Sequence, residues 1–329
     1  GRLMYTKAGL ASALRTEVIV NSPATIVVEL DEPTLQELAV NRVERFATPP
    51  VDASFLFDKE TAEVTIVPSE PGTVVDLAAL PGVVIDAALD TGAARMPIML
   101  GDAPALTTEL AEAMGPFEEV STFTTYHPCC ANRVTNIQLL ADEIDGSIVM
   151  PGETFSINDT AGKRTTAEGY VRAGAIIGGE VYCCDSPVNV GGGTSQFATT
   201  FYNAVFFGCY EDIEHQPHSL YFCRYPYVRE ATLGFPAPDV KFRNDSESPV
   251  FIDTSHTGGS ITVTFYGNNG GRVCTSERSG NTITRVMTHP DGSVTKQSWT
   301  WNYRQPKPKE TTTTTKPPST TTTTEGETT

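Results

Sequence analysis

Three consecutive glycines, Gly191 to Gly193, lead directly into Thr194 and Ser195. Glycine permits positive φ and lets backbone N–H groups come close to a ligand. The residues that recur afterwards at helical spacing are Gln196, Phe197, Thr200, Phe201, Ala204 and Val205. This spacing predicts a helix with one apolar face. Ser195 then lies in or just before the first turn, where unpaired N–H groups and the helix dipole stabilise an oxyanion.

The segment HQPHSLYFCRYPYVRE, residues 215–230, supplies groups that could act with Ser195. His215 and His218 flank a proline and could serve as base and orienting group, because a serine hydroxyl needs a base in hydrogen-bond contact to become a nucleophile. In the alternative interpretation, the histidines are structural hydrogen-bond donors and Thr194 or Ser195 is the N-cap of a buried helix. The residues leave both interpretations open.

The same residues also suit binding without chemistry, because aromatic rings stack on sugars and arginines pair with carboxylates. The predicted ligand-binding residues are Gly191, Gly192, Gly193, Gln196, Arg224, Tyr225 and Arg229. A strand in a packed sheet would also be aromatic, so the pattern alone does not prove a binding surface.

Composition excludes some classes of partner. The 329 residues carry 23 Lys and Arg against 40 Asp and Glu, a net charge of -17, which repels phosphate backbones and anionic lipid surfaces. We therefore expect no nucleic acid partner. The sequence contains no apolar run of about 18 residues that would predict a membrane-spanning segment. The opening Gly-Arg fits a piece of a longer precursor, so we expect an export signal or anchor upstream.

Seven cysteines all lie in the second part of the chain, at positions 129, 130, 183, 184, 209, 223 and 274. A bond within an adjacent pair strains the peptide, so we expect bonds from one pair to the other or to the remaining cysteines. Such bonds indicate an exported protein, and the odd count leaves at least one free thiol or an intermolecular partner. Zinc is the rival hypothesis, since His127 precedes Cys129 by two residues, but no C-x-x-C repeat accompanies it. We expect no metal and no cofactor.

An α/β module is predicted for residues 1–115. Strands surround a turn in residues 16–30, a helix covers 32–47, and a hairpin covers 53–67. A second helical segment at 74–90 is interrupted by Pro81, and a third, at 107–115, begins at Thr107 or Thr108.

The second part of the chain is predicted to be strand-rich. In residues 150–159 a short strand is followed by a turn at Asn158 and Asp159, and residues 176–184 form a hairpin around two glycines. Residues 269–303 form a β extension. The Thr- and Pro-rich residues 304–329 cannot bury enough apolar surface to fold and predict a disordered, wall- or surface-type spacer. The whole chain is expected to be α+β.

Two stretches resemble known families. PPVDASFLF and PGTVVDLAALPGVV, with the lead-in from about residue 10, resemble the peptidoglycan-binding module found beside VanW domains and in some L,D-transpeptidases. FTTYHPCCANRVTNIQLL, MPGETFSIND, GGGTSQFATTFYNAVFFG and HQPHSLYFCRYPYVRE resemble, in this order, the VanW domain over residues 121–268. That family is named from glycopeptide-resistance gene clusters, where its members act as accessories.

The resemblance implies an exported or wall-anchored protein that binds peptidoglycan or another wall glycopolymer. Many VanW domains have Cys where this chain has Ser195, and this difference weakens the case for covalent catalysis. The alternative function is a peptidoglycan hydrolase or transpeptidase that uses Ser195 with His218 or His215 as base. A third possibility, a stalked spacer or adhesin, rests on the Thr-rich tail alone.

Overall fold

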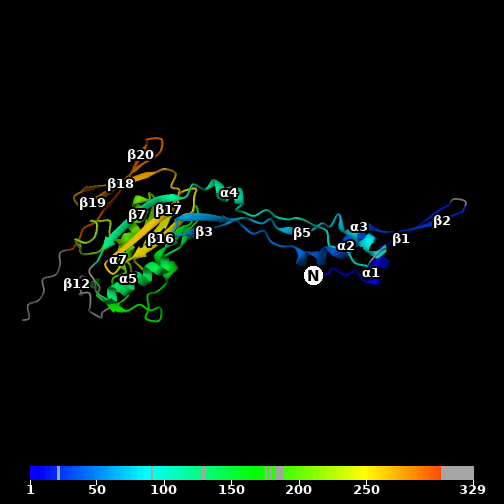
Figure 1. Ribbon diagram of the computed structural model, residues 1–329, viewed down its shortest axis with the longest axis horizontal. Coiled ribbons are helices and arrows are strands. Elements are labelled where there is room, and N and C mark those ends of the chain that lie inside the picture. The colour runs from blue at the N-terminus through cyan, green and yellow to red at the C-terminus, as the bar shows by residue number, and fades with distance from the viewer. Residues whose placement is uncertain are drawn as a thin grey trace, which may run out of the picture.

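The computed structural model describes residues 1–20, 23–89, 92–127, 131–174, 176–177, 180–181 and 189–304. The described elements are mixed helices and antiparallel strands, which confirms the α+β class. They form a small lobe, a large lobe and an extended stalk between them (Figure 1). Within the described residues, no helix is long and apolar enough to cross a membrane.

The small lobe contains the first helices and a projecting hairpin. Its elements are α1 (Lys7–Ser12), β1 (Leu14–Ile19), β2 (Thr25–Leu30), α2 (Glu32–Val43), a 3-10 turn (Glu44–Phe46), β5 (Thr73–Val75), α3 (Leu80–Leu89) and β6 (Ile98–Leu100). Ala39, Val43, Val75 and Leu80 form its core. The predicted break at Pro81 is wrong: Pro81 is the second residue of α3, where its missing N–H costs nothing, and residues 73–75 form a strand.

The stalk consists of residues 47–53, 68–72 and 101–106, which cross between the lobes three times. Isolated bridges pair Thr48 with Thr73 and Val51 with Glu70. The third crossing is tied in by the Gly72 N–H, which donates to Asp102 O at 2.9 Å. A Cβ on Gly72 would lie 2.9 Å from Thr48 O, so only glycine allows this close approach.

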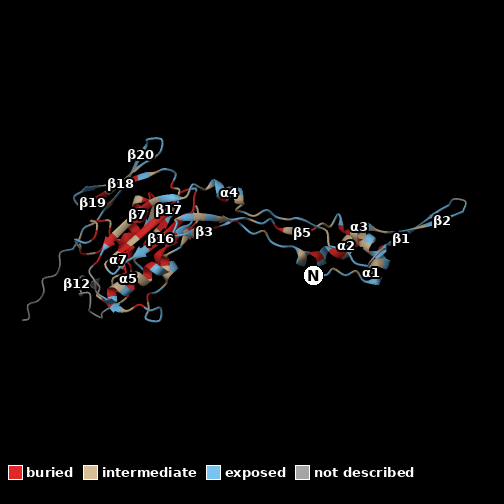
Figure 2. Ribbon diagram, in the orientation of Figure 1, coloured by how far each residue is buried: buried red, intermediate tan, exposed pale blue. Residues whose placement is uncertain are grey.

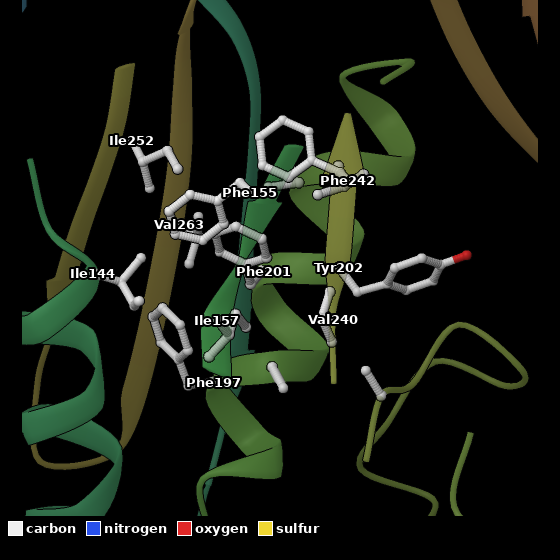
Figure 3. Packing of buried hydrophobic residues seen from close by; sticks show 14 of the residues in the cluster. Ile144, Phe155, Ile157, Phe197, Phe201, Tyr202, Val240, Phe242, Ile252 and Val263 are labelled. Carbon is white, nitrogen blue, oxygen red and sulfur yellow. The ribbon is translucent and has the colours of Figure 1, made fainter. Parts of the chain in front are cut away.

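The central sheet of the large lobe has the order β7 (Glu118–Tyr126), β17 (Ser260–Gly267), β16 (Val250–His256) and β8 (Ile148–Val149), all antiparallel. Alternate residues point to opposite faces of a strand. Ile252 on β16 and Val263 on β17 therefore face the helices α5 (Ala131–Ile144) and α7 (Ser195–Phe207), and share their hydrophobic cluster (Figure 3).

The other face of this sheet is covered by residues from the N-terminal part of the chain. Phe57 of the hairpin β3 (Ser54–Asp58) and β4 (Glu63–Val67) stacks on Phe251 at 5.5 Å and packs against Tyr266 at 5.1 Å. The helix α4 (Thr108–Ala113), with Thr107 as its N-cap, belongs to the same cluster through Ala111. Residues 1–115 thus contribute to two cores, and a domain boundary at 115 stays a prediction.

Helix α7 is buried on all sides, since every residue from Gln196 to Phe206 is buried (Figure 2). The prediction of one apolar face is wrong. The sheet and α5 cover part of the helix, and residues 229–233 and Trp299 cover other sides. A helix that is apolar nearly all round is expected in such a position.

Small sheets complete the large lobe. One sheet has the order β14 (Glu211–Glu214), β15 (Lys241–Arg243) and β9 (Thr154–Ser156), and the short pairs are β10 (Arg172–Ala173) with β13 (Asn189–Val190) and β11 (Ile176–Ile177) with β12 (Glu180–Val181). The β11–β12 pair confirms the predicted strand and return strand at 176–177 and 180–181, while the two glycines between them lie outside the described residues. The predicted turn at Asn158 and Asp159 is wrong, because both lie in α6 (Ile157–Ala161), which the Ser156 side chain caps.

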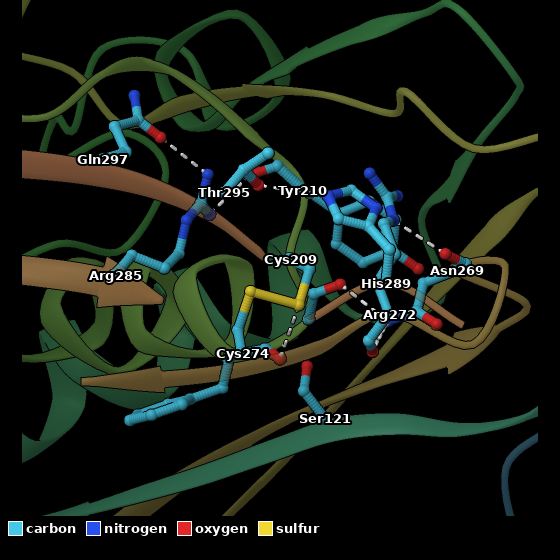
Figure 4. The surroundings of a disulfide bond; sticks show 12 residues. Ser121, Cys209, Tyr210, Asn269, Arg272, Cys274, Arg285, His289, Thr295 and Gln297 are labelled. Atoms are coloured by element: carbon cyan, nitrogen blue, oxygen red, sulfur yellow. Dashed lines mark hydrogen bonds between the residues drawn. A yellow bond between two sulfur atoms is a disulfide. The ribbon is translucent and has the colours of Figure 1, made fainter. Parts of the chain in front are cut away.

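A three-stranded meander, β18 (Val273–Ser279), β19 (Thr282–Thr288) and β20 (Val294–Thr300), forms the predicted β extension. The disulfide Cys209–Cys274 ties it to the segment after α7, and Arg285 donates to Tyr210 O at 2.7 Å beside it (Figure 4). Among the other cysteines, Cys223 is exposed and free. The adjacent pairs at 129–130 and 183–184 lie outside the described residues, so their predicted bonding stays a prediction.

Removing the bridge with Cys274→Ala should lower the free energy of unfolding by about 2–5 kcal/mol, because the bond restricts the unfolded chain. Urea unfolding followed by tryptophan fluorescence measures this, since Trp299 lies in β20. Cys223→Ser is the matched control and should leave the transition unchanged. Equal midpoints for Cys274→Ala and the parent protein would contradict the stabilising role.

Candidate functional site

Ser195 is the first of a row of polar side chains along α7, which we call the polar ladder. Side chains at positions 195, 199 and 203, each four residues apart, lie on one side of the helix. They bind the backbone of the extended segment 229–233: Asn203 Nδ2 donates to Arg229 O at 2.8 Å, Ala231 N donates to Thr199 Oγ1 at 3.0 Å, and Leu233 N donates to Ser195 Oγ at 3.0 Å. The Ser195 hydroxyl therefore holds the neighbouring chain in place.

The first turn of α7 lacks the predicted side-chain cap. Thr194 stands at the N-cap position of α7 but makes no capping hydrogen bond to the first turn. Its Oγ1 instead donates back to Gly191 O at 2.9 Å. The start of the helix is fixed by the turn before it and by the contact from residue 233.

The three glycines are required by close packing inside the protein. Gly191 and Gly193 have φ of 78° and 101°, the left-handed region that favours glycine. A Cβ on Gly192 would lie 2.6 Å from Ala173 O, and one on Gly193 would collide with the Arg133 side chain. The protein itself fills the space above the loop at these two positions.

His215 belongs to a buried network that lies away from Ser195. Its Nδ1 is 2.6 Å from Asp212 Oδ2, and its ring stacks on Tyr202 at 3.8 Å. Tyr202 is seven residues along α7 from Ser195, about 10 Å at 1.5 Å per residue. The structure thus places His215 two helical turns below the first residue of the helix, beside Trp299 of the meander.

His218 contacts a carboxylate that sequence reasoning missed. Its Nδ1 lies 3.3 Å from Oε2 of Glu230, whose side chain has no exposed surface. Neither Glu230 oxygen completes a well-formed hydrogen bond, and burial together with this carboxylate raises the pKa of Tyr303. In the sequence, Glu230 could have been noticed as an acidic residue at the end of the aromatic segment 215–230. The described contacts of His218 and Ser195 do not join the two side chains by a hydrogen bond.

Arg133 on α5 brings two of the predicted ligand-binding residues together. Its Nη2 donates to Gln196 Oε1 at 2.8 Å and to Tyr225 OH at 3.3 Å. Gln196 is fixed in turn, because its Nε2 donates to Thr125 Oγ1 at 2.7 Å. Sequence reasoning missed Arg133; the signal was a single arginine near the start of the largely apolar buried face of α5.

Arg133 is only 4% exposed, yet it forms no ion pair with any carboxylate among the described residues. Burial lowers its pKa, Tyr225 raises it, and the nearby Arg224 lowers it further. A buried charge is costly unless an opposite charge compensates it. This place in the fold therefore favours an anion.

Arg224 and Arg229 have different surroundings. Arg224 is exposed, and its guanidinium lies 4.9 Å from the ring centres of both Phe222 and Tyr225. The Tyr225 ring also stacks on His218 at 5.3 Å. Arg229 instead donates to Asn203 at 2.8 Å and lies over Phe207 at 4.8 Å, inside the large lobe.

We call Arg133, Gln196, Tyr225, Arg224 and His218 the arginine site. Its members come from α5, α7 and the 215–230 segment, which the hydrogen bonds and ring contacts above hold together. No cluster of three or more His, Cys, Asp or Glu residues suited to a metal occurs within the described ranges. Cys129, part of the rival zinc hypothesis, lies outside those ranges.

Ser195→Ala should lower the free energy of unfolding by about 1–3 kcal/mol, because it leaves the Leu233 N–H without its acceptor. Thr199→Val, at the next position of the row, should cost a similar amount, and Ser255→Ala, at an exposed position of β16, should cost nothing. A Ser195→Cys thiol should react slowly with iodoacetamide in the folded protein. Unchanged stability in Ser195→Ala, with rapid alkylation of Ser195→Cys, would contradict the ladder and support an accessible nucleophile.

Comparison with known proteins finds a family match within the large lobe. Residues 132–266 match the family described as VanW like protein. The uncharacterized protein YoaR of Bacillus subtilis (strain 168) is 33% identical over 153 residues, 46% of this chain and 49% of YoaR. The chain thus spans about half the length of this curated relative. No solved structure matches this chain significantly. The predicted peptidoglycan-binding module lies upstream of the matched range and stays a prediction. The motif resemblance over the second part of the chain is confirmed: residues 132–266 are similar to the VanW like protein family.

Proposed function

We propose that this protein is a wall-associated binding protein that works outside the cell and holds peptidoglycan or a related wall glycopolymer at the arginine site. The Cys209–Cys274 disulfide supports an oxidising compartment, because such bonds persist mainly in exported proteins. The wall neighbourhood is supported by the family match and by the Thr-rich C-terminal sequence.

The buried, uncompensated Arg133 is the observation that carries the proposal. Wall peptides and muramic acid residues present carboxylates, and an arginine fork pairs with a carboxylate through two parallel hydrogen bonds. One nitrogen of Arg133 is already held by Gln196 and Tyr225, which orients the rest of the fork. Arg224, lying over Phe222 and Tyr225, adds an exposed cation and aromatic surface next to it.

A hydrolase or transpeptidase acting through Ser195 is supported less well. The Ser195 oxygen accepts the Leu233 N–H, His215 lies about two helical turns away, and His218 faces Glu230. Binding also accounts for Ser at a position where many family members have Cys. We therefore propose that Arg133 and Arg224 bind the wall component.

Arg133→Met should reduce binding of the whole chain to insoluble peptidoglycan by about 10- to 100-fold, since a charged hydrogen-bonded pair contributes about 1.5–3 kcal/mol. The measurement is a pelleting isotherm at 0.15 M and 0.5 M salt. Arg224→Ala should weaken binding less, because this side chain is exposed.

Arg243→Met is the matched control, since this arginine is exposed, pairs with Glu211 and makes none of the contacts that define the arginine site. Each variant is first compared with the parent by thermal unfolding, so that loss of fold is separated from loss of binding. A folded Arg133→Met that binds as tightly as the parent would overturn the proposed site. A parent chain that does not pellet would overturn the proposed function itself.

A further inference from the structure

The β1–β2 hairpin of the small lobe presents an unusual amount of exposed apolar surface. Leu14, Val18, Ile26 and Val28 are 47%, 59%, 67% and 58% exposed. The register pairs Leu14 with Leu30, Thr16 with Val28 and Val18 with Ile26, so these side chains share one face of the ribbon. The hairpin projects from the lobe and is exposed along its length (Figure 2). An isolated two-stranded ribbon of this kind is marginally stable in water, so a third strand would stabilise it.

One edge of this hairpin has outward-turned backbone groups of known orientation, of which Leu14 O accepts a hydrogen bond from the exposed Arg15 Nη1 at 3.3 Å. Asp31 N donates to Ala13 O at 2.7 Å, one pair beyond the Leu14–Leu30 pair at the end of the ladder. Hydrogen-bonded pairs alternate in an antiparallel ladder, so the odd-numbered residues of β1 turn their N–H and C=O groups toward β2. Leu14, Thr16 and Val18 therefore turn theirs outward. In the described residues β1 has β2 as its only strand neighbour, so this outer edge can accept another strand.

The sequence of β1 is complementary to itself in one antiparallel register. If residues i and j of two copies pair so that their numbers add to 32, Thr16 lies opposite its own copy. Arg15 then lies opposite Glu17 twice, and Leu14 lies opposite Val18 on the apolar face. The outward-facing residues 14, 16 and 18 fall on hydrogen-bonded pairs in this register. Arg15 and Glu17 fall on the closer pairs, where opposite charges stabilise a sheet.

We infer that a second copy of this chain pairs along the outer edge of β1, with a two-fold axis at Thr16, to give a four-stranded antiparallel sheet. Two-fold pairing of this kind uses the same surface on both copies. Arg15 reaches Asp31 at 3.5 Å in the single chain, but its side chain is 58% exposed and free to turn to the partner. The contact is narrow, so a weak, concentration-dependent dimer is expected.

Cysteine cross-linking tests the register in the whole chain. In a Cys223→Ser background, Thr16→Cys should give a disulfide-linked dimer under mild oxidation, because its Cα lies about 5.5 Å from its symmetry copy. Val18→Cys is the matched control, since in this register it lies about 14 Å from its own copy. It should give at most a tenth of the dimer, because a disulfide needs Cα atoms within about 7 Å.

Charge exchange tests the same contact without cysteines. Arg15→Glu and Glu17→Arg should each abolish dimerisation measured by sedimentation velocity up to millimolar protein, because each places like charges opposite one another. The double exchange should restore it. Recovery in the double variant distinguishes the contact from simple damage to the hairpin.

Three results would overturn the inference. They are a parent protein that stays monomeric at every concentration, equal cross-linking through positions 16 and 18, and failure of the double exchange to restore the dimer. Monomeric chains that capture an unrelated strand peptide would also overturn it, because the edge would then serve a different partner. None of these results bears on peptidoglycan binding at the arginine site.

Discussion

The burial of α7 is the constraint on which the large lobe depends. A helix with apolar residues on nearly every side must be covered on every side, and four parts of the chain do this. Its few polar side chains then need partners inside the protein, since an unpaired buried polar group costs free energy. Ser195, Thr199 and Asn203 meet this need by binding the backbone of residues 229–233.

The same constraint explains why the arginine site exists. Fixing residues 229–233 along the helix also fixes Glu230 next to His218 and, through the 215–230 segment, places Tyr225 within reach of Arg133. Gln196, at the second position of α7, connects this group to β7 through Thr125. The polar residues of the site are therefore held by the packing of a hydrophobic helix.

Much of the fold was predictable from local patterns. β-branched runs predict the strands within 16–30 and the hairpin within 53–67, and of the two predicted helix caps, Thr107 or Thr108, the structure has Thr107. The errors have physical reasons: Pro81 is tolerated inside the first turn of a helix, and Asn158 and Asp159 follow a serine cap into a helix. The burial of α7 on all sides was missed because periodicity does not show how many neighbours a helix has.

The candidate site was predictable only in part. The motifs predict four of its residues, Gln196, Tyr225, Arg224 and His218. Arg133 contacts Tyr225, 92 residues away in the sequence, and Glu230 contacts His218, 12 residues away. Residue spacing alone cannot reveal such contacts. The role of Ser195 was ambiguous for the same reason, since its partner at residue 233 lies on a distant segment.

The three crossings of the stalk also have a mechanical meaning. Its backbone hydrogen bonds, between residues 48 and 73, 51 and 70, and 72 and 102, run across the long direction of the protein (Figure 1). A pull that separates the two lobes would be shared by three continuous crossings of the chain, and these bonds hold the crossings side by side. The stalk is then a spacer that keeps the two lobes apart, because it can lengthen only by drawing chain out of one of them.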